Sequence, residues 1–325
     1  MTRLDFEPAG RSNRGARATL RVRGRVGLVI CVVLILIVVA LGALRLATSR
    51  SNGPGPAGPP IRYLGVFEPG SPQSYANVEG FARAVGRPPN LVSYYSFWNE
   101  DFQQDFAQTA ASDGATTIVE VEPYVSLAKI ASGAYDSYLI RYADEVAAFK
   151  HKVVISFGHE MNGYWYPWAY HSTPAKTFVA AWRHFVDVFR EQGADNVIWL
   201  WQVNSLNAKT GSPHDWWPGS NYVTWVGVSG YYYTPGNSFD NVFNPVVNDI
   251  RQFTQDPLLI AETAVGPPAG QSRGIADLFA GIRFNHFLGL VWFDQHSTAG
   301  GYKGENWRLE GDRNGLAAFR KALKG

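Results

Sequence analysis

The sequence predicts an α/β fold, a (β/α)8 barrel of the TIM type that follows one N-terminal transmembrane helix and a Gly/Pro-rich linker. Two observations predict the barrel. Eight short apolar runs alternate with segments of helical periodicity, and the part of the chain that contains them is 265 residues long. Eight strand-helix units in roughly 250 residues match the usual size of such a barrel. A doubly wound dinucleotide fold is disfavoured, because Phe67-Glu68-Pro69-Gly70 follows the first run where a Gly-rich phosphate loop would stand.

The N-terminal part predicts membrane insertion. Residues 1–26 hold seven arginines against Asp5 and Glu7, and residues 27–44 carry no charge. A membrane-spanning helix needs about 20 apolar residues, with a tolerance of a few. Because excess positive charge keeps a terminus in the cytoplasm, we predict a cytoplasmic tail over 1–26 and a single-pass signal anchor over 27–47. The expected localisation is the cell membrane with the C-terminal part outside, and a cleaved signal peptide with secretion is the alternative.

Residues 48–60 are expected to be an extended linker, since seven of the ten residues from 51 to 60 are Gly or Pro. Residues 61–325 are then expected to form one large domain, with 20 basic and 25 acidic side chains. Such a net negative charge argues against a nucleic-acid partner. The single cysteine, Cys31, lies in the apolar segment and excludes an intrachain disulfide. We expect a monomer.

Each apolar run is expected to be one barrel strand, and each segment between runs a helix. The runs are Tyr63 to Phe67, Leu91 to Tyr95, Thr117 to Val121, Val153 to Phe157, Val197 to Trp201, Trp225 to Ser229, Leu258 to Ala261 and Leu288 to Phe293. Two of the intervening helices are well marked. Residues 135–150 place apolar side chains on one stripe, and residues 174–192 begin with a proline.

The active site of a barrel lies at the C-terminal ends of its strands, so polar and aromatic residues there are the candidates for function. They are Glu68, Trp98, Glu122, His159, Glu160, Asn204, Tyr231, Glu262, Trp292 and Asp294. We expect this mixture of acids and rings to lie on one face of the barrel.

A His-Glu pair follows the fourth run, and a loop with several aromatic rings, among them Trp165 and Trp168, comes next. A carboxylic acid beside flat apolar faces suits a sugar-cleaving site, because the acid protonates a glycosidic oxygen while the rings cover pyranose faces. A zinc protease motif, H-E-x-x-H, is excluded, since its second histidine would stand at Gly163.

Two carboxyls are candidates for a catalytic pair. Glu160 follows the fourth run and Glu262 follows the seventh, directly after four apolar residues. A carboxyl in such apolar surroundings is costly to bury unless it is used. Retaining glycosidases need two carboxyls about 5 to 5.5 Å apart, one as acid/base and one as nucleophile.

With these residues in view, the sequence resembles glycoside hydrolase family 26, the family of β-mannanases and some β-glucanases. The resemblance covers nearly all of residues 61–325. It is carried by Tyr135-Asp136-Ser137-Tyr138, His159-Glu160-Met161-Asn162-Gly163, Trp165-Tyr166-Pro167-Trp168, Trp217-Pro218-Gly219, Tyr222-Val223, Trp225-Val226-Gly227-Val228, Gly230-Tyr231, Ile260-Ala261-Glu262-Thr263, Val291-Trp292-Phe293 and Asn306-Trp307-Arg308.

The resemblance implies a (β/α)8 barrel and hydrolysis with retention. It implies that Glu160 is the acid/base, Glu262 the nucleophile and Tyr231 the phenol that donates to the nucleophile. It also implies that Trp292 lies under the sugar being cleaved, and that His159 replaces the asparagine that the wider clan has before its acid.

This chain departs from the family pattern at a few positions. Many relatives have an arginine where Ser156 stands, and an acidic residue where this chain has Ser229 or Thr224. These positions are expected to support the site or line its floor. Their replacement leaves the substrate and the rate open.

The chemistry of the residues agrees with this division of roles. Apolar neighbours such as Tyr164 and Trp165 should raise the pKa of Glu160, while a phenol donor should favour the ionised form of Glu262. The further candidates for substrate binding are His159, Trp165, Trp168, Tyr231, Trp292, Asn204, Glu122 and Trp98. For Trp98 and for the Trp216-Trp217 pair, core packing is the alternative role.

The sequence therefore predicts an outward-facing, membrane-anchored endo-β-glycosidase with a polysaccharide substrate, β-1,4-mannan first. The alternatives are β-1,3-1,4-glucan or an exopolysaccharide, and a barrel that binds glycans without cutting them. The presence of Glu160, Glu262 and Tyr231 together argues against the binding barrel. Two carboxyls carry the chemistry, so we expect no metal and no organic cofactor.

Overall fold

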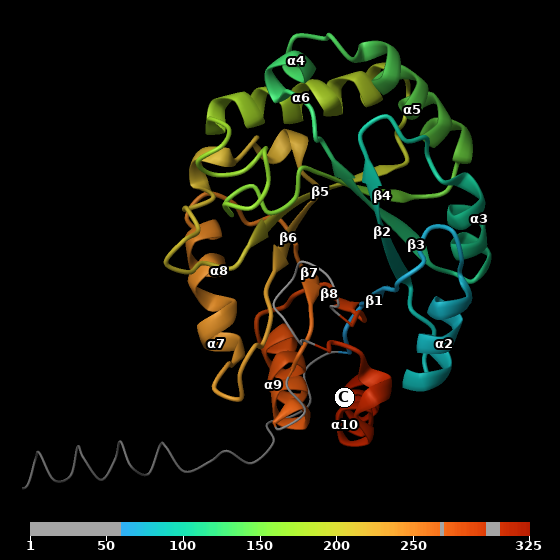
Figure 1. Ribbon diagram of the computed structural model, residues 1–325, viewed down its shortest axis with the longest axis vertical. Coiled ribbons are helices and arrows are strands. Elements are labelled where there is room, and N and C mark those ends of the chain that lie inside the picture. Colours follow the sequence, from blue (N-terminus) through green and yellow to red (C-terminus); the bar gives the residue numbers. More distant parts are fainter. Residues whose placement is uncertain (1–59, 267–269, 297–305) are drawn as a thin grey trace, which may run out of the picture. The chain divides into compact units, whose positions relative to one another are not determined.

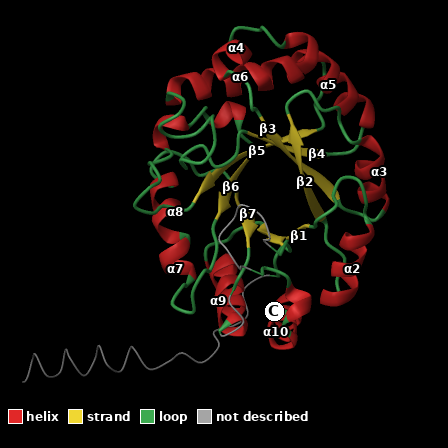
Figure 2. Ribbon diagram, viewed as in Figure 1, coloured by secondary structure: helices red, strands yellow, loops and turns green. Residues whose placement is uncertain are grey.

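The computed structural model describes residues 60–266, 270–296 and 306–325. In these ranges eight parallel strands form a closed barrel in chain order, and helices surround it (Figures 1 and 2). The barrel predicted from the sequence is confirmed. The predicted tail over 1–26, the signal anchor over 27–47 and all of the linker over 48–60 except Pro60 lie outside the described residues. Within the described ranges, no helix is long and apolar enough to cross a membrane.

The strands begin and end close to the apolar runs of the sequence. They are β1 (Tyr63–Phe67), β2 (Leu91–Phe97), β3 (Thr116–Glu122), β4 (Val153–Phe157), β5 (Val197–Asn204), β6 (Trp225–Ser229), β7 (Leu258–Thr263) and β8 (Gly289–Phe293). Pairing of β1 with β8 closes the barrel.

The helices that surround the barrel are α2 (Ala76–Val85), α3 (Gln104–Ser112), α4 (Leu127–Ala131), α5 (Asp136–Phe149), α6 (Ala175–Glu191), α7 (Phe239–Val242), α8 (Asn244–Ile250), α9 (Gln271–Phe284) and α10 (Arg313–Lys324), with short 3-10 turns η1 (His214–Trp216), η2 (Ser220–Tyr222) and η3 (Leu309–Gly311). Helix α6 illustrates how these helices pack against the barrel. Its buried Phe178, Trp182, Phe185 and Phe189 recur at helical spacing and form one apolar stripe. The Phe185 ring stacks on Phe157 of β4, with ring centroids 4.7 Å apart.

The barrel interior changes character along its axis. Side chains alternate across a strand, so residues two apart point the same way. Val154 of β4 belongs to a buried apolar cluster inside the barrel, and Ser156 lies two residues nearer the C-terminal end. The same step leads from Ile118 to Glu120 in β3, and from Leu200 in β5 to a glutamine. The interior is therefore apolar towards the N-terminal ends of the strands and polar towards the C-terminal mouth.

An irregularity in β7 aims its last carboxyl at that mouth. Val228 of β6 pairs with Ile260, but the next residue, Ser229, pairs with Glu262, so β7 carries one extra residue, Ala261. Such a bulge changes which face the following side chain points to. Ala261 belongs to the inner apolar cluster, and the carboxyl of Glu262 still faces the interior, where it meets Tyr95 and Tyr231.

Candidate active site

The carboxyl of Glu160 lies at the C-terminal end of β4, between two neutral donors. Its Oε1 accepts from Asn204 Nδ2 at 2.7 Å, and its Oε2 accepts from Trp165 Nε1 at 3.0 Å. The backbone of Glu160 has φ 54°, in the left-handed region that a glutamate rarely adopts. Such a conformation costs about 1–3 kcal/mol and persists where its surroundings hold it. Here the Glu160 amide donates to Gln202 O at 2.8 Å.

The segment directly after Glu160 positions the two groups that donate to its carboxyl. Asn162 is fully buried, and it holds β5 through two bonds: its Oδ1 accepts from Asn204 N at 2.7 Å and its Nδ2 donates to Asn204 O at 2.8 Å. A Cβ at Gly163 would lie 2.6 Å from the Trp165 ring. Glycine therefore leaves room for the indole, whose N–H reaches Glu160. Both neutral donors of Glu160 are placed by its own loop.

Burial and the neighbouring negative charge of Glu262 raise the pKa of Glu160 to about 7. Hydrogen bonds from Asn204, Ser229 and Trp165 act in the opposite direction. Below neutral pH the carboxyl is therefore mainly protonated, which is the state that a general acid needs.

The carboxyl of Glu262 is bound by two phenols. Tyr231 donates to its Oε1, and Tyr95 of β2 donates to its Oε2. Burial raises the pKa of Glu262, while the two phenols lower it by stabilising the ionised form. Both oxygens are held, so the carboxylate has a fixed orientation, as a nucleophile requires.

Tyr95 is a site residue that the sequence analysis missed. The predicted second strand ends at this residue, and a tyrosine at a strand end carries no motif. One signal was available. Tyr95 lies an even number of residues after Leu91, whose side chain points into the barrel, so alternation places the phenol inside as well.

A buried chain of polar groups lies against the catalytic carboxyls. His159 Nε2 is 2.9 Å from the hydroxyl of Tyr166, and its Nδ1 is 3.7 Å from Glu120 Oε2. Burial lowers the pKa of His159 to about 3 and raises the pKa of Glu120 well above its usual value. His159 is therefore neutral near pH 7, and its contact with Glu120 is no ion pair. His159 positions the Tyr166 ring and carries no charge into the site.

The structure brings together most of the residues that the sequence predicted for the site. Asn204 and Trp165 donate to Glu160, Tyr231 donates to Glu262, and the two carboxyls lie near enough for the charge of Glu262 to raise the pKa of Glu160. Trp165 keeps 41% of its surface exposed, so its ring offers a face to a ligand.

Trp292 lies elsewhere than expected. Its ring is fully buried and packs against Phe319 of α10, with ring centroids 5.3 Å apart. Alternation along β8 explains the difference, since Trp292 points out to the helices while Phe293 points inward and stacks on Phe67. In this position the Trp292 ring cannot lie under a sugar, and the expectation from the resemblance is corrected.

Two more tryptophans are packing residues in this structure. Trp168 is 1% exposed, stacks on Tyr166 and donates to His159 O at 2.8 Å. Trp98 is 8% exposed and packs edge-on against Tyr138. Neither ring offers a free face for a sugar, so their assignment to substrate binding is corrected. Trp168 contributes indirectly, by holding the loop that carries His159.

Three further expectations about strand ends are also corrected. Glu68 and Asp294 lie with Trp292 on the outer side of the barrel wall, where Asp294 Oδ1 accepts from Leu309 N at 2.8 Å. Burial and the neighbouring Asp294 raise the pKa of Glu68 to about 9, so the two acids share a proton away from the mouth. Thr224 precedes β6, and its hydroxyl accepts from Trp199 N at 3.2 Å at the N-terminal end of the barrel. It does not line the floor of the site.

The other two positions where departures from the family pattern were expected, Ser156 and Ser229, do line the floor of the site. Ser156 pairs in register with Glu120 on the neighbouring strand, and the Ser229 hydroxyl accepts from Gln202 Nε2 at 2.9 Å. Both serines are fully buried. Within the described ranges, no group of three or more His, Cys, Asp or Glu side chains is placed to hold a metal ion.

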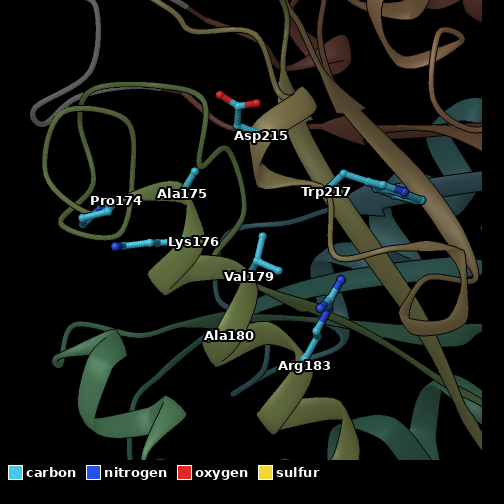
Figure 3. Close-up of a pocket in the computed structure, with 8 residues that line it drawn as sticks. All are labelled: Pro174, Ala175, Lys176, Val179, Ala180, Arg183, Asp215 and Trp217. Atoms are coloured by element: carbon cyan, nitrogen blue, oxygen red, sulfur yellow. The ribbon is translucent and has the colours of Figure 1, made fainter.

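A separate hollow lies on the outer surface beside α6 (Figure 3). Lys176 and Arg183 of the helix and the ring of Trp217 line it, and Trp217 also packs on Trp201 at 4.9 Å between ring centroids. Trp216 is 3% exposed and belongs to the core. None of the residues that line this hollow contacts Glu160 or Glu262.

A closed (β/α)8 barrel with two buried carboxyls at its C-terminal mouth defines the class of (β/α)8 glycosidases. Comparison with known proteins is consistent with this class. The model of Glycosyl hydrolase family 26 matches residues 92–264, and the chain belongs to this family. The enzyme class expected from the sequence, glycoside hydrolase, is thereby confirmed at the level of the family.

Three curated relatives illustrate the range of the family. Endoglucanase H of Acetivibrio thermocellus is 30% identical over 272 residues, which are 78% of this chain and 29% of that protein. Beta-1,3-xylanase TXYA of a Vibrio species is 27% identical over 210 residues, or 59% of this chain and 43% of the relative. Mannan endo-1,4-beta-mannosidase A and B of Caldalkalibacillus mannanilyticus is 29% identical over 117 residues, which are 34% of this chain and 21% of that protein. The chain thus spans less than half the length of each of these relatives.

Solved structures show the same fold. A mannanase of Bacillus subtilis superposes with a TM-score of 0.58 at 16% identity, over 77% of this chain and 87% of that one. The YdhT protein of Bacillus subtilis gives a TM-score of 0.60 at 15% identity, over 81% of this chain and 86% of that one. At such identities the likeness concerns the fold alone.

Proposed function

We propose that this chain is a retaining endo-β-glycanase that hydrolyses an extracellular polysaccharide. The observation that carries the proposal is the difference between two carboxyls that share one mouth. Glu160 has neutral donors and a pKa of about 7, whereas Glu262 is bound on both oxygens by phenols that favour its ionised form. One protonated and one ionised carboxyl are the two reactants of a double displacement.

In the first step the Glu262 carboxylate attacks the anomeric carbon of the bound sugar. The bond from that carbon to the glycosidic oxygen breaks, and the proton of Glu160 moves to the departing oxygen. The product is a glycosyl ester on Glu262 and a shortened chain with a free hydroxyl. Tyr231 and Tyr95 hold the carboxylate in line for attack.

In the second step a water molecule attacks the same anomeric carbon. Glu160, now ionised, takes a proton from the water while the ester bond to Glu262 breaks and restores the carboxylate. Two inversions at one carbon give net retention. The exposed face of Trp165, whose N–H binds the acid, is placed to cover the sugar that leaves.

For the substrate, β-glucan is favoured by the comparisons, although the sequence analysis placed β-1,4-mannan first. The match to the endoglucanase extends over 272 residues, whereas the match to the mannosidase extends over 117. Mannan is therefore the second candidate. Full-length protein should be incubated with mannan, mixed-linkage glucan, β-1,3-xylan and cellulose, and reducing ends measured. Release from mannan alone would reverse this order, and release from none of them would favour an exopolysaccharide substrate or the barrel that binds glycans without cutting them.

The two roles are tested by separate substitutions. Glu262→Ala should abolish turnover, because no glycosyl ester can form, and Glu160→Ala should spare the first step on substrates with activated leaving groups, which need no proton. Azide should then rescue the second step of Glu160→Ala as a β-glycosyl azide. Glu79→Ala, an exposed carboxyl on α2, is the matched control and should leave activity unchanged.

The stereochemical outcome supplies an independent measurement. Proton NMR of the first products should show the β-anomer before mutarotation. Early appearance of the α-anomer would exclude the double displacement. Binding of glycans without any hydrolysis by the parent protein would support the non-catalytic barrel instead.

A further inference from the structure

Glu122, the last residue of β3, has an unusual position for a carboxyl. It is 6% exposed, and no residue in the described ranges donates a hydrogen bond to its side chain. Its side-chain oxygens still reach solvent, so they are open to a ligand that enters the mouth of the barrel. Its burial and the nearby charges of Glu262 and Glu100 raise its pKa to about 7. At neutral pH the group can both donate to and accept from a ligand.

Alternation along the strands shows where this carboxyl points. Glu122 lies two residues beyond Glu120, so it projects into the barrel mouth one layer further out. On the adjacent strand β2, Phe97 lies two residues beyond Tyr95 in the same way, and Phe97 is paired in register with Glu122. Since Tyr95 donates to Glu262, this outer layer adjoins the catalytic pair.

Two exposed rings flank the carboxyl. Phe97 keeps 53% of its surface exposed and Tyr124, just after β3, keeps 50%. Their ring centroids are 5.7 Å apart at an interplanar angle of 40°. Tyr124 also packs edge-on against the buried Trp168, at 5.1 Å between ring centroids, which fixes its ring. An exposed, supported aromatic pair at the edge of a site is a surface for an apolar ligand face.

We propose that Phe97, Tyr124 and Glu122 form a sugar-binding subsite for a pyranose unit of the same polysaccharide chain, separate from the unit whose bond is cleaved. The proposal rests on the proposed function for the identity of its ligand. The apolar face of the pyranose lies on the rings, and ring hydroxyls donate to or accept from Glu122. A sugar is the ligand that fits, because it combines a flat C–H face with hydroxyls at its rim.

Such a subsite contributes to binding of long substrates and leaves the chemical step unchanged. Phe97→Ala with Tyr124→Ala should raise the KM for mixed-linkage glucan about tenfold, with kcat close to that of the parent. Glu122→Leu should have an effect of similar size on KM, because it removes the hydroxyl partner. Hydrolysis of 2,4-dinitrophenyl β-glucoside, which carries one sugar, should stay unchanged in the double ring variant.

Phe284→Ala is the matched control. This ring at the end of α9 is 83% exposed and stands before β8, at the opposite end of the barrel. If the double ring variant keeps a KM for the polymer within about twofold of this control, the subsite is overturned. A loss of activity on the single-sugar substrate equal to the loss on the polymer would also overturn it, because the rings would then support the fold or the catalytic pair.

A binding measurement separates this inference from the proposed function. Calorimetric titration of Glu262→Ala protein with a mixed-linkage glucan hexasaccharide and with mannohexaose needs no turnover. Weaker binding after removal of the two rings supports the subsite even if the parent hydrolyses neither polymer, an outcome that would refute only the hydrolase proposal. Equal affinity with and without the rings, or no binding of either hexasaccharide, overturns the subsite.

Discussion

At the scale of residues, the site works with neutral donors. Within the described ranges, the side-chain hydrogen bonds to Glu160 come from an amide, an indole and the Ser229 hydroxyl, and those to Glu262 come from two phenols. Ser156 is fully buried and pairs in register with Glu120, so the floor holds a small hydroxyl at that point. A neutral donor lowers a carboxyl pKa less than a cation does. Burial therefore dominates, and the pKa of both carboxyls is raised.

The raised pKa of Glu160 predicts the alkaline side of the pH profile. Glu160 must be protonated to act as the acid, so kcat/KM should fall as pH rises through about 7. Asn204→Ala removes a donor that stabilises the ionised form. The pKa should then rise, and the alkaline limb should move to higher pH while kcat falls about tenfold. The exposed Asn221→Ala is the control, and a limb that stays in place in Asn204→Ala would contradict the role of the amide.

Each phenol on the nucleophile should matter separately. Tyr231→Phe and Tyr95→Phe each remove one donor from Glu262, and we expect kcat to fall about ten- to hundredfold with little change in KM. The acidic limb of the pH profile should move to higher pH, because each phenol lowers the pKa of Glu262. Tyr63→Phe, inside the N-terminal half of the barrel, is the control. A kcat equal to that of the parent would remove the phenol concerned from the site.

At the scale of elements, strand alternation decides what the sequence could predict. The strands β1, β4 and β6 have the bounds that the apolar runs predicted, and Glu160 stands three residues after the end of β4. The direction of a side chain is harder to derive. Trp292 differs from Phe293 by one residue and points to the opposite side of the wall. The bulge at Ala261 cannot be read from the sequence, because it depends on pairing between strands.

Closure of the barrel depends on one glycine at the start of β8. Gly289 has φ 157°, and a Cβ there would lie 1.9 Å from the carbonyl oxygen of Tyr63 on β1. Gly289→Ala would push β1 and β8 apart, and we expect a loss of more than about 4 kcal/mol in the free energy of unfolding. Gly236→Ala, where the nearest atom is 3.7 Å away, is the control. Chemical denaturation followed by tryptophan fluorescence measures both, and equal midpoints would show that the junction can relax.

At the scale of the whole molecule, the regular spacing of runs made the barrel predictable. Eight strand-helix units leave few other ways to bury eight apolar runs in 265 residues. The residues that complete the site from β2 and β3 carry no motif, and their roles follow from positions in a closed circle of strands. Strand alternation could have indicated that Tyr95 points inward, but its bond to Glu262 and the Phe97–Tyr124 pair are seen only in the structure.

The N-terminal sequence yields the last prediction, that the chain stays in the membrane with its catalytic domain outside. The uncharged segment 27–44 is flanked by seven arginines before it and by Arg45 and Arg50 after it, and Leu44-Arg45-Leu46-Ala47 is a poor cleavage site. A polysaccharide too large to enter the cell would then meet the enzyme at the surface. After fractionation, we expect the protein in membranes, with residues 61–325 lost when intact cells meet protease. A soluble form beginning near residue 48 would show that the segment is a cleaved signal. Replacing the seven arginines by glutamine should weaken the orientation, and protection of the catalytic domain in that variant would confirm the role of the charges.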